Sequence, residues 1–127
     1  MTPGIRRDLT ISYDAALARL PDALKGEGFG VLTEIDVAAT LKAKLGVDFR
    51  RYKILGACNP TLAHQALGTM LEVGVMLPCN VVVYERDDGS ATVIAIDPMQ
   101  TMATQDARLA AIAEDVRGRL VRVIAQL

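Results

Sequence analysis

The sequence predicts an α+β fold in which helices pack on one face of a mostly antiparallel sheet of about five strands. Three observations support this prediction. Short strand-like and helix-like stretches follow one another in the order β-α-β-α-β-α-β-β-α. The stretch NVVVYERDDGSATVIAID has Asp-Gly between two β-branched runs, which is a strong hairpin signal. The C-terminal stretch TQDARLAAIAEDVRGRLVRVIAQL carries apolar residues at helical spacing.

Length and composition indicate one domain over residues 1–127. Apolar residues make up 51% of the chain and aromatic residues only 4%, so the core is aliphatic, and the excess favours a homo-oligomer. A net charge of −1 argues against a nucleic-acid binder, which needs a basic excess. The sequence has neither a signal-peptide pattern nor the roughly 18-residue apolar run of a membrane span. We therefore expect a cytoplasmic protein with no membrane partner and with reduced cysteines.

The N-terminal half begins with a predicted strand at residues 6–12, where Leu9 and Ile11 share a face. Ser12 is a suitable N-cap for the helix YDAALARLPDALKGEG. Pro21 inside that helix predicts a kink or a break near Arg19 and Leu20, because proline removes a backbone hydrogen bond.

Two further strands and two helices follow. FGVLTEIDV at residues 29–37 is a strand, and AATLKAKLG at 38–46 is a short helix. YKILGAC at 52–58 is the third strand. Asn59 and Pro60 then begin a helix that ends near Gly74, since Asn at the N-cap and Pro at the first helical position form a strong start signal.

The hairpin sets the register of the last two strands. If Asp88 and Gly89 form a two-residue turn, Tyr84 lies opposite Val93, Val82 opposite Ala95, and Asn80 opposite Asp97; a bulge would shift this register by one residue. In the final helix the apolar stripe comprises Leu109, Ile112, Ala113, Val116, Leu120, Val123, Ile124 and Leu127.

Polar residues gather where the third strand ends and the fourth begins. Cys58 and Cys79 lie at the same end of the sheet if these strands are antiparallel neighbours. The predicted ligand-binding residues at this end are Cys58, Asn59, His64, Cys79, Asn80 and Asp97. Two thiolates and an imidazole suit a soft metal, which makes Cys58, Cys79 and His64 candidate metal ligands. A thiol at a helix start can also be a nucleophile, and buried cysteines often serve only packing.

Three other groups of residues have a functional and a simpler interpretation. Lys42, Lys44, Arg50, Arg51 and Lys53 could bind an anion, but such clusters are usually solvated surface. Glu34 and Asp36 could form a carboxylate pair, although an exposed strand face explains them. Met70, Met76, Met99 and Met102 could bind copper, and packing is the simpler explanation. No Gly-rich phosphate loop, serine nucleophile elbow or HExxH motif is present.

With these motifs in view, the chain closely resembles the bacterial and archaeal family called domain of unknown function 302. The resemblance rests on GFGVLTEIDV, LKAKLGVDFRRYKILGACNP, LAHQAL, MLPCNVVVYE and AEDVRGRLVRVI, and extends from about residue 9 to the C-terminus. It implies a TBP-like β-α-β₄-α fold with short extra helices and a homodimer, but no activity, cofactor or catalytic residue. Pro21 departs from the family pattern. The positions that match the family motifs are Cys58, Asn59, Pro60, Pro78, Cys79, Asn80 and Asp97.

The sequence thus favours a homodimeric binding module with a small-molecule or soft-metal pocket at the Cys58/Cys79 end of the sheet. A thiol-dependent enzyme, redox or acyl-transferring, that uses Cys58 or Cys79 is one alternative, and a purely structural or interaction protein is another. The ligand and any cofactor stay open at this stage.

Overall fold

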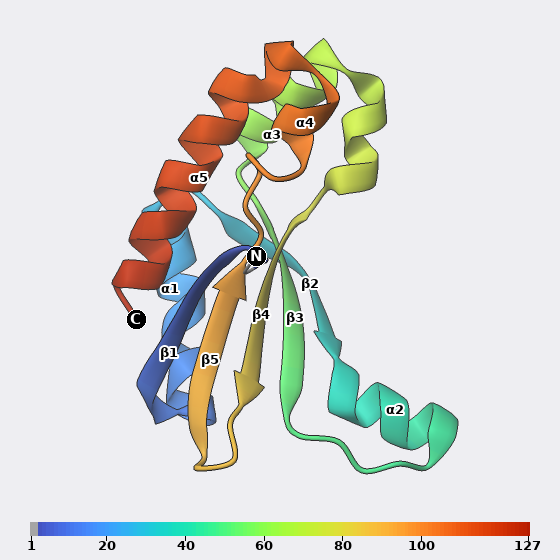
Figure 1. Cartoon of the computed structure of the whole chain (residues 1–127), viewed down its shortest axis with the longest axis vertical. Helices are drawn as coiled ribbons and strands as arrows, with labels where there is room; N and C mark the ends of the chain where they lie inside the picture. Colours follow the sequence, from blue (N-terminus) through green and yellow to red (C-terminus); the bar gives the residue numbers. More distant parts are fainter. Residues whose placement is uncertain (1–2) are drawn as a thin grey trace.

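The computed structural model describes residues 3–127 and contains a five-stranded antiparallel sheet with the strand order β1-β5-β4-β3-β2 (Figure 1). The strands are β1 (Ile5–Ser12), β2 (Gly30–Asp36), β3 (Tyr52–Cys58), β4 (Cys79–Glu85) and β5 (Ser90–Ala95). The predicted α+β class and the antiparallel sheet are therefore confirmed.

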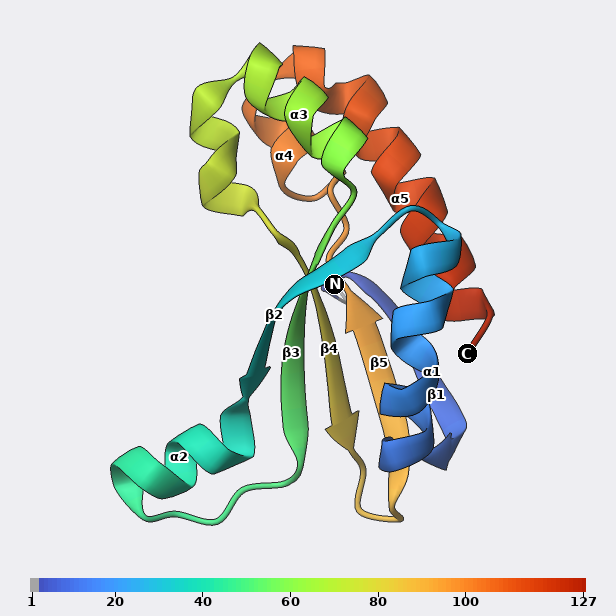
Figure 2. The same ribbon diagram turned by 180° about the vertical axis from the view of Figure 1, so that it is seen from behind.

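Two long helices cover one face of the sheet, and shorter helices extend the molecule beyond one end of it. The helices are α1 (Tyr13–Gly26), α2 (Val37–Leu45), α3 (Pro60–Thr69), α4 (Met102–Gln105) and α5 (Ala110–Ala125), with 3-10 turns η1 (Leu71–Met76) and η2 (Ala107–Leu109). Helices α1 and α5 lie against the β1/β5 side of the sheet, and α3, η1 and α4 lie with the start of α5 beyond the sheet end (Figures 1 and 2).

The main core lies between the sheet and helices α1 and α5. Val81 and Val83 of β4 both face this core, because every second residue of a strand points to the same face of the sheet. Leu9 and Ile11 both face this core, as predicted. Seven of the eight residues predicted for the apolar stripe of the last helix are buried, and Ile112 is half-buried.

A second, smaller core holds the helices beyond the sheet end. Its buried members are Ala66, Val73, Met102, Leu109 and Ala113. Ile112 packs against both cores, so the two clusters meet beside it.

Several helix boundaries differ from the sequence prediction. Helix α1 runs through Pro21 without a break, and Pro21 is exposed, so water can satisfy the backbone group that proline leaves free. Helix α3 ends at Thr69, and the chain continues as a 3-10 turn. Helix α5 begins only at Ala110, because the side chain of Asp106 accepts a hydrogen bond from Arg108 N and caps a separate turn.

The predicted hairpin register is wrong by one residue. Tyr84 pairs with Thr92, Val82 with Ile94 and Val81 with Ala95. The turn contains three residues instead of two, since Arg86 N donates to Ser90 O at 2.8 Å and Gly89 N donates to Arg86 O at 2.9 Å. Gly89 has φ +86°, the left-handed conformation that closes such a three-residue loop. Asn80 consequently lies opposite Ile96, whose N donates to Asn80 O, and not opposite Asp97.

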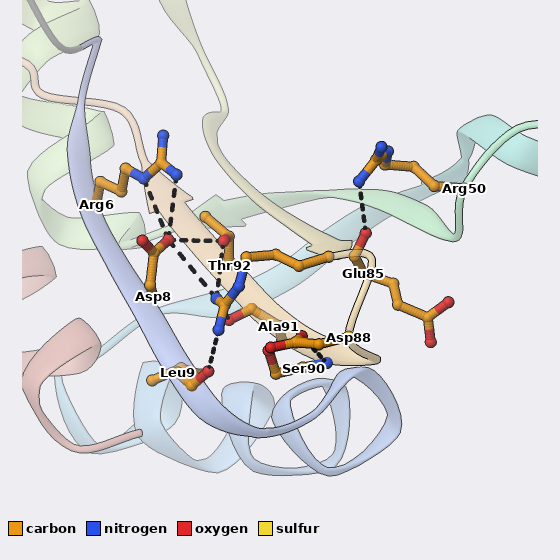
Figure 3. Close-up of polar contacts among 10 residues, drawn as sticks. Arg6, Asp8, Leu9, Arg50, Glu85, Asp88, Ser90, Ala91 and Thr92 are labelled. Carbon is orange, nitrogen blue, oxygen red and sulfur yellow. Dashed lines mark hydrogen bonds and ion pairs between the residues drawn. The ribbon is translucent and has the colours of Figure 1, made fainter.

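A polar network on the sheet face away from the helices ties β1 to β5 (Figure 3). The carboxylate of Asp8 accepts a hydrogen bond of 2.7 Å from the hydroxyl of Thr92, which is fully buried. The guanidinium of Arg86 donates to Leu9 O and Ala91 O, each at 2.7 Å. Because the β1–β5 register shifts between Asp8 and Ser12, Arg86 satisfies a β1 carbonyl where the strand ladder is interrupted.

Strand β2 is the edge strand that pairs with β3, and helix α2 projects from the end of the sheet opposite to the small core (Figure 1). Every residue of β2 is exposed, and α2 contains no buried residue. Within residues 3–127, none of the helices combines the length and apolar character that a membrane crossing requires.

Candidate functional site

The two cysteines meet at one end of the sheet. Strands β3 and β4 are antiparallel neighbours, and Ala57 pairs with Cys79, so Cys58 at the end of β3 lies diagonally next to Cys79 at the start of β4. Cys79 is buried and Cys58 is half-buried, and both are free thiols. The expected adjacency of the two strands is confirmed.

Both thiols line a cavity of about 310 Å³ that lies between the main core and the small core. Three alanines, Ala57 of β3 and Ala63 and Ala66 of α3, form much of its wall together with the cysteines. Because these side chains are small, they leave space that longer aliphatic side chains would fill. The cavity therefore exists because small side chains lie at the junction of the two cores.

Apart from Asn59, the remaining wall is aliphatic, and much of it comes from distant parts of the chain. Leu32 contributes from β2, Leu77 and Pro78 from the segment that enters β4, and Met102 and Ile112 from α4 and α5. The peptide bond between Leu77 and Pro78 is cis. No charged side chain is among the described residues that line the cavity.

Asn59 is the polar side chain at this site, and it has a structural partner. It caps α3, with its Oδ1 accepting a hydrogen bond of 3.2 Å from Leu62 N, and Pro60 follows at the first helical position. A Cβ at Gly28 would lie 2.8 Å from Asn59 Nδ2, and Gly28 has φ +85°, so glycine is required there for two reasons. The start of α3 is thus fixed against the turn that precedes β2.

Burial opposes ionisation of the inner thiol. It raises the pKa of the Cys79 thiol from 9.0 to about 11, and the neighbouring Cys58 adds to this rise. A thiol must be deprotonated to act as a nucleophile or as a metal ligand. Cys79 is consequently a neutral, mainly apolar part of the wall at physiological pH.

The other predicted site residues lie elsewhere. His64 is exposed on α3 and does not line the cavity. Asn80 and Asp97 border a separate hollow of about 370 Å³, whose lining includes Tyr52 and Val82. Asp97 accepts hydrogen bonds from Arg117 Nε at 3.0 Å and Met99 N at 2.9 Å. The predicted cluster of six residues is therefore divided.

The divided cluster limits what the cavity can bind. Within residues 3–127, no three His, Cys, Asp or Glu side chains lie close enough together to hold a metal ion. The imidazole proposed as a third metal ligand is one of the groups outside the cavity.

Most of the basic cluster is engaged in ion pairs. Lys42 contacts Asp48 at 2.9 Å, Arg50 contacts Asp87 at 3.2 Å, and Lys53 contacts Glu34 at 2.8 Å. These pairs fit the solvated-surface interpretation better than an anion site.

Arg51 lies over the ring of Tyr13 and pairs with Asp14 and Glu85. The predicted carboxylate pair is also accounted for, since Glu34 binds Lys53 and the carboxylate of Asp36 caps α2.

The methionines fit packing in the second core. Met102 is buried there, Met70 and Met76 pack against it, and Met99 is exposed at 38%.

Comparisons with known proteins identify the family. A family model described as "Domain of unknown function DUF302" matches residues 5–127. The chain belongs to this family. The DUF302 domain is also similar to a solved structure described as "Crystal structure of uncharacterized conserved protein DUF302 from Bacillus stearothermophilus". The two share 36% identity with a TM-score of 0.84, and the match covers 94% of this chain and 93% of the other. No curated protein matches the chain.

Sequence reasoning missed most of the cavity wall in this DUF302 domain. Met102 and Ile112 reach the cavity because the second core packs them beside α3, and Val116 reaches it from the main core. Helical spacing could have predicted that His64 lies outside the cavity. Leu62 and Ala66 are four residues apart and face inward, so His64, midway between them, points away from the core.

Proposed function

We propose that this DUF302 domain is a homodimeric binding module that takes a small, neutral, apolar molecule into the cavity at the Cys58/Cys79 end of the sheet. The observation that carries the proposal is a cavity of about 310 Å³ with an aliphatic wall and no charged lining residue among those described. Ligand pockets begin at roughly 300 Å³ and are mostly apolar. A dry apolar cavity of roughly 150 Å³ admits benzene, so this one has room for a fused bicyclic or a medium alkyl group.

The wall chemistry supports a neutral ligand over a soft metal. Only the two thiols offer soft donor atoms in the cavity, and burial keeps Cys79 protonated, with a pKa of about 11. The same burial weighs against Cys79 as the nucleophile of a thiol enzyme. The free thiols fit a reducing compartment such as the cytoplasm.

The binding test uses 1-naphthylamine, a neutral fused bicyclic probe whose fluorescence emission shifts to shorter wavelength in an apolar environment. We expect saturable binding to the wild-type protein. Ala63→Leu should abolish that binding, because the larger side chain extends into the cavity from α3.

Gln65→Leu is the matched control, because it places a leucine on the exposed side of the same helix. It should bind the probe like the wild type. Equal binding by the wild type and Ala63→Leu would place the probe elsewhere and contradict the proposal. Absence of binding by the wild type would favour a structural role for the two cysteines.

A further inference from the structure

The hollow bordered by Asn80 and Asp97, which we call the outer hollow, lies on the sheet face away from the helices. Successive residues of a strand point to opposite faces, so Cys79 lines the cavity beside the thiols and Asn80 lines the outer hollow. The outer hollow has a volume of about 370 Å³ and shares none of its lining residues with that cavity. It is therefore a separate place where a small molecule fits.

Most of the lining of the outer hollow is apolar and held in place by the sheet. Val82 of β4 pairs with Ile94 of β5, and both side chains are half-buried. Tyr52 of β3 adds an aromatic side chain, whose ring is parallel to that of Tyr84 within 6°, with the ring centroids 5.6 Å apart. A surface that is already ordered loses little entropy when a flat apolar molecule binds to it.

The one charged side chain that lines the outer hollow among the described residues is already neutralised. Asp97 is buried, and its two carboxylate oxygens accept hydrogen bonds from Met99 N at 2.9 Å and from Arg117 Nε at 3.0 Å. A charged ligand would lose its hydration here without gaining an unpaired opposite charge. The chemistry of the outer hollow therefore favours a neutral ligand.

Two carboxamides at the outer hollow retain hydrogen-bonding capacity. Gln100 Oε1 accepts a hydrogen bond of 3.1 Å from Gly4 N, which orients the side chain and leaves its N–H donors for another partner. Asn59 uses its carboxamide to cap α3, whereas within residues 3–127 the exposed carboxamide of Asn80 forms no hydrogen bond. Asn80 thus presents both a donor and an acceptor beside an apolar surface.

A carboxamide can donate an N–H and accept with its oxygen at the same time, so it pairs through two hydrogen bonds with a ring that has adjacent N–H and C=O groups. We propose that the outer hollow binds a flat, neutral cyclic amide, which pairs with the carboxamide of Asn80 and lies against Val82 and Ile94. This inference goes beyond the proposed function and does not depend on it.

The test uses 2-pyridone, a flat cyclic amide, and N-methyl-2-pyridone, which lacks the N–H group. Binding to the full chain is followed by nitrogen-15 NMR through the backbone signals of Val82 and Ile94 and the side-chain amide signal of Asn80, which is the signal missing from Asn80→Ala. We expect 2-pyridone to shift these signals saturably in the wild type. N-methyl-2-pyridone should bind about tenfold or more weakly, and Asn80→Ala should weaken 2-pyridone binding by a similar factor, because each change removes hydrogen bonds to the ligand.

The matched control is Gln105→Ala, which removes a carboxamide on α4 outside the outer hollow and should bind 2-pyridone like the wild type. Absence of saturable shifts at Asn80, Val82 and Ile94 in the wild type would overturn the proposal. Equal affinity for the two pyridones, or equal affinity of the wild type and Asn80→Ala for 2-pyridone, would also overturn it. Displacement of 1-naphthylamine by 2-pyridone would place the cyclic amide beside the thiols instead, whereas failure of 1-naphthylamine to bind would count only against the proposed function.

Discussion

Replacing Ala63 by leucine distinguishes an open cavity from a closed, well-packed junction, because the two cases predict opposite effects on stability. Leucine has three more carbon atoms than alanine, and burial of each is worth about 0.8 kcal/mol, or about 2.4 kcal/mol in total. Loss of rotamer freedom costs about 0.5–1 kcal/mol. Since Ala63 is half-buried and part of the new side chain would meet solvent, we expect a net gain of about 1 kcal/mol in the free energy of unfolding.

The assay is urea unfolding followed by circular dichroism, with thermal unfolding as a second measure. A gain of about 1 kcal/mol should raise the melting temperature by about 3–5 °C in a domain of this size. If the space were already filled, the added group would overpack it and destabilise the protein by about 1–3 kcal/mol. A lower free energy of unfolding for Ala63→Leu would therefore refute the presence of the cavity. The control Gln65→Leu should leave the free energy of unfolding nearly unchanged.

Three further predictions test the physical account of the site and its supports. The unfolded chain loses the Cys79 proton near pH 9, and the folded chain loses it only near pH 11. The free energy of unfolding of the wild type should therefore fall by about 2 kcal/mol between pH 9 and pH 11, relative to that of Cys79→Ala. Parallel pH profiles of the two proteins in urea unfolding would contradict the raised pKa. Arg86→Met leaves the carbonyls of Leu9 and Ala91 without their donor and should cost about 2–4 kcal/mol in urea unfolding, whereas exposed Arg6→Met should cost less than about 0.5 kcal/mol; equal costs would refute the bridging role. Asn59→Ala should cost about 1 kcal/mol through loss of the α3 cap, and Asn59→Asp, which keeps a capping oxygen, should restore most of the helix stability measured by thermal unfolding.

Local patterns predicted the elements and their buried faces well. The positions of Leu9 and Ile11 on the core face follow from strand alternation, and the buried stripe of α5 follows from helical spacing. The register of the hairpin could not be fixed in this way, because Asp-Gly fits either a two-residue turn or a three-residue loop with Gly89 in the left-handed conformation. That single residue is what separates Asn80 from the position opposite Asp97.

In the candidate site, the adjacency of the two cysteines could be predicted from the sequence, but the rest of the cavity wall could not. Antiparallel pairing of β3 and β4 was enough to bring Cys58 and Cys79 together. The shape of the cavity depends on Met102 and Ile112, which approach from far along the chain through the second core. No periodicity near the cysteines encodes that approach. The exposure of β2 and α2 was hidden as well, since the strand-like and helix-like patterns of residues 29–46 do not reveal that the fold leaves these two elements without a buried residue.

The central claim is that an apolar cavity lies beside the two thiols, and diffraction from crystals pressurised with xenon tests it most directly. Xenon enters dry apolar cavities and is seen as an isolated density peak. We predict a peak bounded by Ala57, Ala63 and Cys79 in the wild type, and no peak at that position in Ala63→Leu. A chain of ordered waters in that space, or side chains that close it, would contradict the claim.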